Sequence, residues 1–326
     1  MTNPLRTLLA TAFSLACATF AGAADAQQPY PSKPIRLVVP FGAGGGVDIT
    51  TRAMAKIISP GLGQSVIVDN RTGANGSIGA QAVARSEPDG HTFLITGTIF
   101  LIFPSMVANA PYDPLREFTP VGLIGWVPQI LVVHPALPVK SVDELIALAK
   151  GRPGQLNYAS GGNGSGAHMA AELFMRQANV KMTHVPYKSD APAIVDLLGG
   201  HIMVKFDNVV TSLPHVKAGK LRALGLTSAT RSRLLPDVPA IAERVPGYEA
   251  SIFYAMFAPA GTPPEIVNRM HSELTKFTNS ADSREAFARQ GVDLQSSPSP
   301  KEFAAFVKSD FGKWAKIIRE AGIKAD

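Results

Sequence analysis

The sequence predicts an α/β fold built from parallel strand–helix–strand units. Short apolar runs alternate with segments of helical periodicity along most of the chain. Two glycine-rich turns, at residues 40–48 and 160–166, each follow a strand-like run and precede a helix-like one. Because parallel strands need a long crossover, usually a helix, this alternation favours parallel sheets. The 326 residues are enough for two domains of about 150 residues each.

The N-terminal third supplies the first of these units. The apolar run at residues 35–40 predicts a strand, and the periodic segment after the first glycine-rich turn predicts a helix. The dipeptide Asp89-Gly90 is a turn signal that precedes a later strand. We expect strands at residues 35–40, 66–68 and 92–96, and helices at 49–62 and 78–85.

The rest of the chain repeats the pattern. Ser141 followed by Glu144 is typical of a capped helix start, because the two side chains can each accept a backbone N–H of the first turn. The expected strands are residues 129–134, 156–159, 183–186, 202–206 and 252–258. The expected helices are residues 141–150, 166–177, 191–198, 263–278 and 300–321.

Residues 1–26 have the pattern of an export signal peptide. Arg6 gives a positive start, residues 7–20 are apolar, and Ala24-Asp25-Ala26 is a small-x-small cleavage site before Gln27. The apolar run is shorter than the roughly 20 residues that cross a bilayer, so no membrane-embedded segment is expected. A lipoprotein with a lipid on Cys17 is the alternative, although Ser14 stands where a bulky aliphatic residue usually begins a lipobox.

Charge and cysteine content restrict the expected partners and the expected sources of stability. The net charge is +6 and the sequence pI is about 9.4, but no run of five or six Lys or Arg residues occurs. Nucleic acid is therefore not an expected partner, and the positive balance favours small anions. Cleavage after Ala26 removes Cys17, the only cysteine, so the mature chain can form no disulfide and depends on core burial.

The two glycine-rich turns are the candidate binding elements. Backbone N–H groups at a helix start can point at an anion, and glycine lets a ligand approach the backbone closely. For either turn alone, a tight connection between strand and helix is an equally good interpretation. The candidate residues are Phe41, Ala43, Gly44, Gly45, Gly46 and Asp48 in the first turn, and Ser160, Gly161, Gly162, Asn163 and Ser165 in the second.

Catalytic interpretations find little support. Gly42-x-Gly44 resembles the start of a dinucleotide fingerprint, but the third glycine is missing. Ser160 and Ser165 are not part of a G-x-S-x-G nucleophile elbow. The seven histidines form no H-E-x-x-H motif or close pair. We therefore expect no catalytic residue, cofactor or metal, and keep an exported α/β enzyme acting on a small carboxylate as the alternative function.

Seven short segments resemble one known family and occur in its order along the mature chain. They are YPSKPIR from residue 30, DNRTGANG from 69, EPDGHT from 87, HVPYK from 184, DLLGG from 196, FDN from 206 and APAGTP from 258. On these segments the chain resembles the Bug-type extracytoplasmic solute-binding receptors of tripartite tricarboxylate transporters.

The resemblance implies a type II periplasmic-binding-protein fold, in which two α/β domains close like a hinge on a small carboxylated solute. The crossing strands would be residues 129–132 and 253–257. Domain 1 would be residues 27–129 plus 253–326, and domain 2 residues 130–252. The implied protein is a monomeric periplasmic receptor that delivers its solute to transporter membrane subunits. A sensory binding protein would use the same cleft.

The resemblance also implies roles for single residues. The turns at 43–48 and 160–165 would hold carboxylate oxygens through backbone N–H groups, hydroxyls and water. Asp48 would cap its helix or orient a loop amide, since a bare carboxylate would repel an anion. Tyr187 and Lys188 would line the cleft.

Three polar residues keep two interpretations each. His168 would donate to the ligand or lie in the core. Asp207, expected just after the strand at 202–206, would bind a water or a ligand amine or hydroxyl, or end the strand in a turn. Lys205 would pair with Asp207 or lie on the solvent face. The sequence does not specify the solute.

The signal peptide makes a direct prediction. The exported protein should begin at Gln27, because signal peptidase cleaves after small-x-small. Intact-mass measurement and N-terminal sequencing of the protein from a periplasmic extract would test this. A lipid-modified N-terminal Cys17, lost in a Cys17→Ser variant, would instead establish the lipoprotein alternative.

Overall fold

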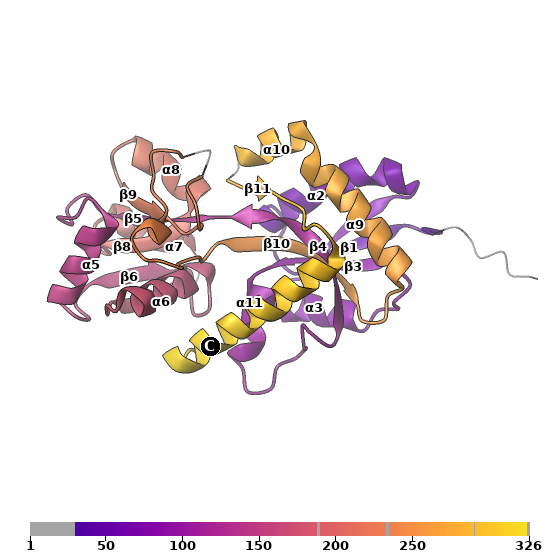
Figure 1. Ribbon diagram of the computed structural model, residues 1–326, viewed down its shortest axis with the longest axis horizontal. Coiled ribbons are helices and arrows are strands. Elements are labelled where there is room, and N and C mark those ends of the chain that lie inside the picture. The colour runs from indigo at the N-terminus through magenta and orange to yellow at the C-terminus, as the bar shows by residue number, and fades with distance from the viewer. Residues whose placement is uncertain (1–29, 188–189, 233–234, 290, 325–326) are drawn as a thin grey trace, which may run out of the picture.

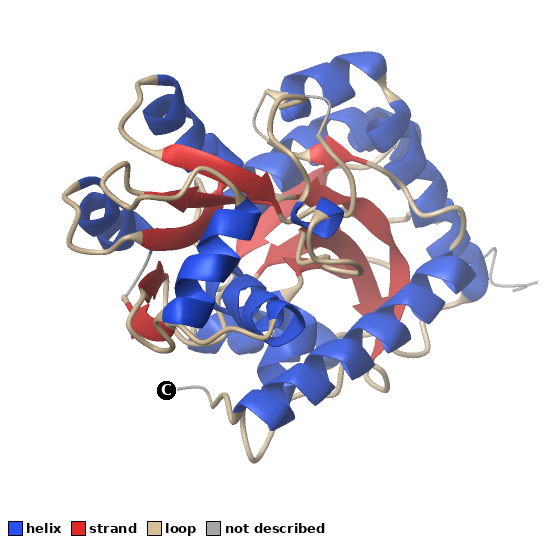
Figure 2. Cartoon of the chain, turned by 60° about the vertical axis from the view of Figure 1, so that its left-hand side comes forward, coloured by secondary structure: helices blue, strands red, loops and turns tan. Residues whose placement is uncertain are grey.

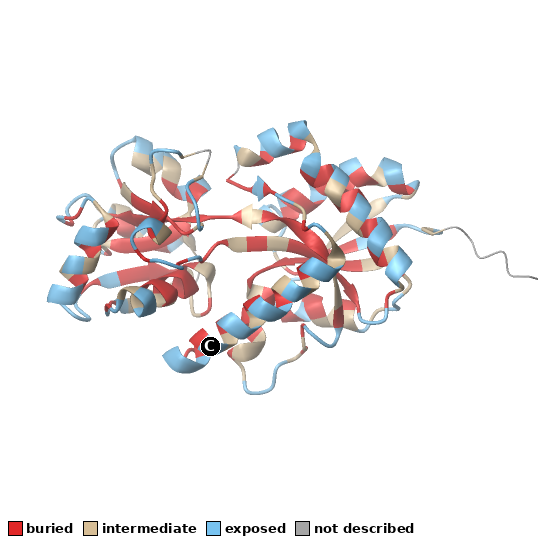
Figure 3. Cartoon of the chain, in the orientation of Figure 1, coloured by how far each residue is buried: buried red, intermediate tan, exposed pale blue. Residues whose placement is uncertain are grey.

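The computed structural model describes residues 30–187, 190–232, 235–289 and 291–324, and shows two β-sheets side by side along the long axis (Figure 1). Helices pack on both faces of each sheet (Figure 2). Most residues of the strands are buried, including those of the strands that run between the sheets (Figure 3). The expected α/β class with parallel strands is confirmed.

Six described strands form the first sheet. They are β1 (Ile35–Val39), β2 (Val66–Asn70), β3 (Thr92–Gly97), β4 (Phe118–Val127), β10 (Ile252–Pro259) and β11 (Asp293–Leu294). Their spatial order is β11-β4-β10-β3-β1-β2. β1 pairs in parallel with β2 and β3, whereas β10 lies antiparallel to β3 and β4.

Side chains alternate between two apolar layers on this sheet. Leu37 and Phe93 belong to the layer that contains α2 and α9, whereas Val38 and Leu94 belong to the layer that contains α3, α4 and α11. The helices are α2 (Gly46–Leu62), α3 (Ser77–Ala84), α4 (Ile99–Ile102), α9 (Pro264–Asn279), α10 (Ala281–Ala288) and α11 (Pro300–Ala321), with 3-10 turns η1 (Ala74–Gly76) and η2 (Phe103–Ser105).

The second sheet comes from the middle of the chain. Its strands are β5 (Gln129–Val133), β6 (Asn157–Ser160), β7 (Thr183–Pro186), β8 (Val204–Asn208) and β9 (Arg222–Leu226), in the order β7-β6-β8-β5-β9. Leu131 and Val133 share a core with α5 and α6, and Ile130 and Val132 share one with α7 and α8. These helices are α5 (Val142–Gly151), α6 (Gly166–Ala178), α7 (Asp190–Leu198) and α8 (Val209–Lys217), followed by the 3-10 turn η3 (Ile241–Glu243).

Two chain segments connect the sheets. β4 passes into β5 with only Pro128 between them, and β10 returns to the first sheet (Figure 1). Gln129 pairs with Asn208 at the end of β8, and Tyr254 pairs with Gly97 at the end of β3. The C-terminal ends of the parallel strands in both sheets therefore lie next to the crossing segments.

All expected strands and helices are present, with ends shifted by up to three residues. Residues 129–132, expected to cross between domains, pair within the second sheet, and the unexpected β4 precedes them. β4 was missed because Pro120, Gly122 and Gly125 are turn signals. Pro120 lies at a register shift, and a Cβ at Gly125 would be 2.6 Å from the Asp293 carbonyl oxygen. The expectations also omitted α4, α8, α10, β9 and β11.

The junction of β3 and β10 requires a residue without a side chain. A Cβ at Gly97 would lie 2.7 Å from the backbone oxygen of Phe253. We expect Gly97→Ala to lower the free energy of unfolding by about 1–3 kcal/mol, as overpacked core positions do. Gly312→Ala is the control, because Gly312 lies in α11 with open space around it, and we expect it to raise stability by about 0.5–1 kcal/mol. Urea unfolding midpoints test both, and equal midpoints would contradict the close contact.

Candidate functional site

The first glycine-rich loop is an exposed turn between β1 and α2. Residues 42–46 are exposed and Phe41 is half-buried. The helix starts at Gly46 with Gly45 as its N-cap, so the first-turn N–H groups have no acceptor within the helix. Gly44 has φ +81°, a conformation that favours glycine. The loop therefore presents backbone donors without side chains.

Asp48 holds this loop in place. Its buried carboxylate accepts the Gly44 N–H at 2.9 Å, the Arg52 Nε–H at 3.0 Å and an Asn70 Nδ2–H at 3.0 Å. Asn70 also donates to the Phe41 carbonyl oxygen at 3.0 Å. Burial raises the pKa of Asp48, but the hydrogen bonds from Arg52, Gly44 and Asn70 lower it more, so the pKa lies below its ordinary value of 3.8. Of the two roles expected for Asp48, it therefore orients a loop amide.

The second loop, between β6 and α6, has the same construction. Ser165 is the N-cap, and its Oγ accepts the His168 N–H at 3.3 Å. Gly164 has φ +73° and donates its N–H to His168 Nδ1 at 3.0 Å. In both loops, a glycine with positive φ one residue before the N-cap donates its N–H to the side chain of the third helical residue. We call this contact the N3 clamp; its members are Gly44 with Asp48, and Gly164 with His168.

Ser160 and His168 lie behind the second loop. Ser160 is fully buried, accepts the Gly162 N–H at 3.1 Å, and lies 2.6 Å from His184 Nε2. The hydroxyl that was expected at the ligand is thus in contact with other protein groups, because the last residue of β6 turns its side chain inward. His168 Nδ1 is already an acceptor, so its ring hydrogen is on Nε2, which lies 3.6 Å from Glu172. Of its two interpretations, His168 has the core one.

Stacked rings and one carboxylate support His168. The His168 and His184 rings stack with centroids 3.9 Å apart, and Tyr158 stacks on His184 at 4.9 Å. The Tyr158 hydroxyl donates to Glu172 at 2.9 Å. Burial raises the pKa of Glu172, but the hydrogen bonds from His168 and Tyr158 lower it by a larger amount. The pKa of Glu172 therefore lies below its ordinary value. Burial and Glu172 raise the pKa of Tyr158.

Asp207 and Lys205 form a buried ion pair. Asp207 belongs to β8 rather than following it, and its two oxygens accept Lys205 Nζ–H and Ser212 Oγ–H, both at 2.6 Å. It is fully buried, and both of its oxygens accept hydrogen bonds from protein groups. The expected contact with an ordered water or with a ligand amine or hydroxyl has no counterpart among these hydrogen bonds. Lys205 is also fully buried and donates to Asp190 at 2.7 Å. The pairing interpretation of Lys205 is confirmed, and the solvent-face one is wrong.

Tyr187 and the loop residues 161–163, which were also expected at the ligand, lie at the ends of β7 and β6 in the second sheet. Tyr187 is half-buried and donates its hydroxyl to Asp196 at 2.6 Å. Burial and Asp196 raise the pKa of Tyr187 to about 12. Lys188 lies outside the described residues. The loop residues at 161–163 are half-buried.

Three unexpected side chains lie next to the loops, two of them from the strands at the crossing and the third, Met106, from the residue after η2. A Cβ at Gly46 would lie 2.6 Å from the Tyr254 hydroxyl oxygen, and one at Gly166 would lie 3.4 Å from Gln129 Nε2. Gln129 is buried, and its Oε1 has no hydrogen-bond partner among the described residues. Met106 contacts Gly164 from the first sheet's side. No sequence motif marks these residues, because the path of the crossing strands places Tyr254 and Gln129 there and tertiary packing places Met106 there.

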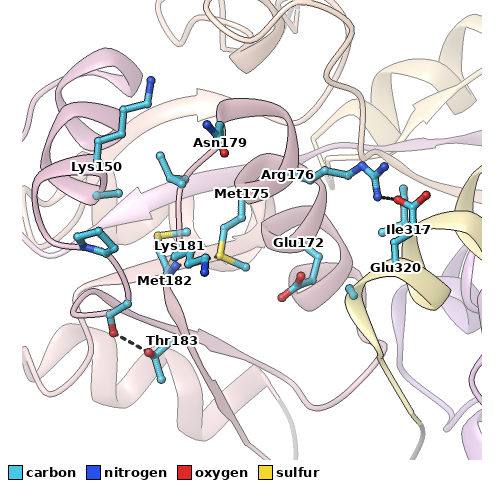
Figure 4. A pocket seen from close by; sticks show the side chains of 15 residues that line it. Lys150, Glu172, Met175, Arg176, Asn179, Lys181, Met182, Thr183, Ile317 and Glu320 are labelled. Carbon is cyan, nitrogen blue, oxygen red and sulfur yellow. Dashed lines mark hydrogen bonds and ion pairs between the residues drawn. The ribbon is translucent and has the colours of Figure 1, made fainter.

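A separate cavity of about 980 Å³ lies between α6, the start of β7 and the end of α11 (Figure 4). Its wall includes Lys150, Met175 and Lys181, and an ion pair of Arg176 with Glu320 joins α6 to α11. None of the residues expected at the ligand lines it. Glu172, which supports His168, is part of its wall and connects it to the second loop.

The described residues contain neither a membrane-spanning helix nor a cluster of metal ligands. No helix there is both long and apolar enough to cross a bilayer. No group of three or more His, Cys, Asp and Glu side chains in the same part of the chain could hold a metal ion.

Comparisons with known proteins agree with the geometry. The family model for the tripartite tricarboxylate transporter family receptor, TctC, matches residues 50–323. Protein BugT of Bordetella pertussis is 37% identical over 325 residues, which cover 99% of each chain.

Two solved structures have the same fold at similar length. R. palustris Rpa4515 with adipate is 37% identical with a TM-score of 0.77, and the match covers 91% of this chain and all of that one. MatC from Rhodopseudomonas palustris with bound malate is 28% identical with a TM-score of 0.73, covering 89% of this chain and all of that one. The expected two-domain binding-protein class of fold is confirmed by these neighbours.

The clamp at Asp48 gives a prediction for stability and its pH dependence. Asp48→Asn should lower the free energy of unfolding at pH 7 by about 1–3 kcal/mol, because the hydrogen bonds that the buried, charged Asp48 carboxylate accepts are weakened or lost. The pKa of Asp48 is lowered in the folded state, so the unfolded chain takes up this proton first as the pH falls. The wild-type contribution is full above about pH 4 and declines below it as the folded-state pKa is approached.

Urea unfolding at several pH values between 3 and 7 measures this. The free-energy difference between wild type and Asp48→Asn should shrink as the pH falls below about 4. Asp237→Asn is the control, because Asp237 is exposed and follows the last strand of the second sheet. Its free energy of unfolding should stay close to that of wild type at every pH. A wild-type minus Asp48→Asn difference that is constant with pH would contradict the clamp.

Proposed function

The chain belongs to the tripartite tricarboxylate transporter receptor family, and we propose that it binds a small organic carboxylate between its two sheets and delivers it to the membrane subunits of such a transporter. The family is one of receptors, and the proposed mechanism breaks no bond. We further propose that the protein works in the periplasm as a monomer, after removal of residues 1–26.

The observation that carries the proposal is the pair of clamped loops. Both loops present backbone N–H groups at a helix start, next to the crossing strands. Neutral donors and helix dipoles stabilise an anion by about 0.3–1 kcal/mol per helix terminus, and bridging waters add adaptable contacts. Adipate and malate in two relatives support a carboxylate as the ligand class here.

The strands are divided between two sheets, which supports a division of the chain into two domains. We assign residues 27–129 plus 253–326 to domain 1 and residues 130–252 to domain 2, because the chain passes between the sheets only at β4–β5 and β10 within the described residues. A ligand that touches both loops would stabilise a closed arrangement, and the membrane subunits would recognise that arrangement.

The proposed binding groups differ from the sequence-based set. The carboxylate would lie against the backbone of residues 43–46 and 161–166, with the Tyr254 hydroxyl and the Gln129 amide below. Ser160, His168 and Asp207 would act only by holding these loops and the adjoining strand. The role of Tyr187 at the rim stays a proposal.

A thermal-shift screen of the refolded mature protein tests the function. Mono-, di- and tricarboxylates would be added at millimolar concentration. A ligand at one hundred times its dissociation constant adds about 2.7 kcal/mol, which corresponds to an upward shift of about 5 °C. The ligand should bind in one equivalent and be recovered unchanged, whereas conversion into a product would identify an enzyme.

A loop variant makes the screen specific. Gly45→Val should remove the thermal shift, because its side chain would occupy the space that the ligand needs. The extended backbone at φ −74° is one that valine adopts, and the new Cβ would lie 3.3 Å from the Gly42 carbonyl oxygen. Gly151→Val, at the end of α5 with open space around it, is the control and should keep the shift. No shift with any carboxylate in wild type would overturn the proposed function.

A further inference from the structure

A cluster of three charges lies beside the second loop. Lys205 Nζ donates to Asp207 at 2.6 Å and to Asp190 at 2.7 Å, and its third contact is the Phe206 carbonyl oxygen at 3.4 Å. The Lys205 ammonium is fully buried and surrounded by these acceptors. It therefore has no hydrogen left for the carboxylate of a ligand.

The three members differ in exposure. Asp207 is fully buried and uses both oxygens, one with Lys205 and one with Ser212. The side chain of Asp190 is 42% exposed. Its Oδ1 binds Lys205, while its Oδ2 accepts no hydrogen bond from a described residue. Asp190 is thus the member of the cluster that an entering ligand can reach.

Asp190 also lies at the candidate loop itself. A Cβ at Gly161 would lie 3.1 Å from both carboxylate oxygens, so a side chain at this position would crowd Asp190. Two carboxylates and one ammonium leave one negative charge uncompensated within the cluster. A second carboxylate of a ligand would be repelled here, whereas an ammonium group would gain a charged hydrogen bond.

We propose that Asp190 is a specificity-determining residue that selects a carboxylate carrying an ammonium group over a dicarboxylate of the same length. The ligand carboxylate is held by the clamped loops, and the ammonium faces Asp190 Oδ2. This inference rests on the proposed function, since it concerns the same site.

Matched probes test the inference by isothermal titration calorimetry on the mature protein. The four-carbon set is butyrate, 2-aminobutyrate, 4-aminobutyrate and succinate, and the six-carbon set is hexanoate, 2-aminohexanoate, 6-aminohexanoate and adipate. At least one amino acid should bind about tenfold or more tightly than the dicarboxylate of its set, as expected for one charged hydrogen bond. Asp190→Asn should reduce that ratio by about tenfold or more.

Two further variants complete the design. Asp190→Ser also removes the charge and keeps an oxygen that can accept a hydrogen bond at the start of α7, so its affinity ratio should match that of Asp190→Asn. If one of the two variants folds poorly, the other still tests the role of Asp190. Asp237→Asn changes the net charge equally at an exposed position and should leave the ratio unchanged. Circular dichroism and urea midpoints would confirm that the variants fold.

The outcomes distinguish the two proposals. Tighter binding of succinate or adipate to wild type, an unchanged ratio in both Asp190 variants, or an equal loss of affinity for every probe would overturn the role of Asp190. Any of these results would leave the carboxylate receptor intact. Failure of every carboxylate in the thermal-shift screen would instead overturn the proposed function.

Discussion

The arrangement of the candidate site depends on the N3 clamp. A glycine N–H that precedes a helix would otherwise face solvent or the ligand, and the loop could then take several conformations. In the two clamps this N–H is bound from behind, by the carboxylate of Asp48 in one loop and by the ring of His168 in the other. The chemical groups differ but the geometry is the same. Each acceptor is itself held by neighbours, Arg52 and Asn70 in one case and the stacked His184 ring in the other.

The crossing strands connect the two clamped loops physically. Tyr254 on β10 lies under Gly46, and Gln129 at the start of β5 lies under Gly166. The strands that join the sheets are therefore also the floor below both helix starts. A change in the angle between the sheets would alter the relation between these side chains and the loops above them, so that ligand contact and sheet orientation are coupled through the same two strands.

The sequence predicted the strand–helix alternation and both loops, because hydrophobic period and glycine content are local properties. It predicted side-chain direction less well. Lys205 and Asp207 are two residues apart in one strand, so alternation alone places them on one face, and this was weighed only as one possibility. Ser160 belongs by sequence to the second glycine-rich turn, but it ends β6 and its side chain turns inward. Tyr254 and Asp190 reach the loops through tertiary packing, which no local pattern encodes.

The cluster of Lys205, Asp190 and Asp207 has a kinetic consequence. The chain as a whole carries a charge of +6, which speeds the arrival of any small anion and weakens in salt. The cluster is a negative charge at short range, inside that positive field. Under the proposed selectivity, arrival and retention would depend on opposite charges: the positive surface would attract every small anion alike, and the Asp190 carboxylate beside Gly161 would set how long each one stays bound.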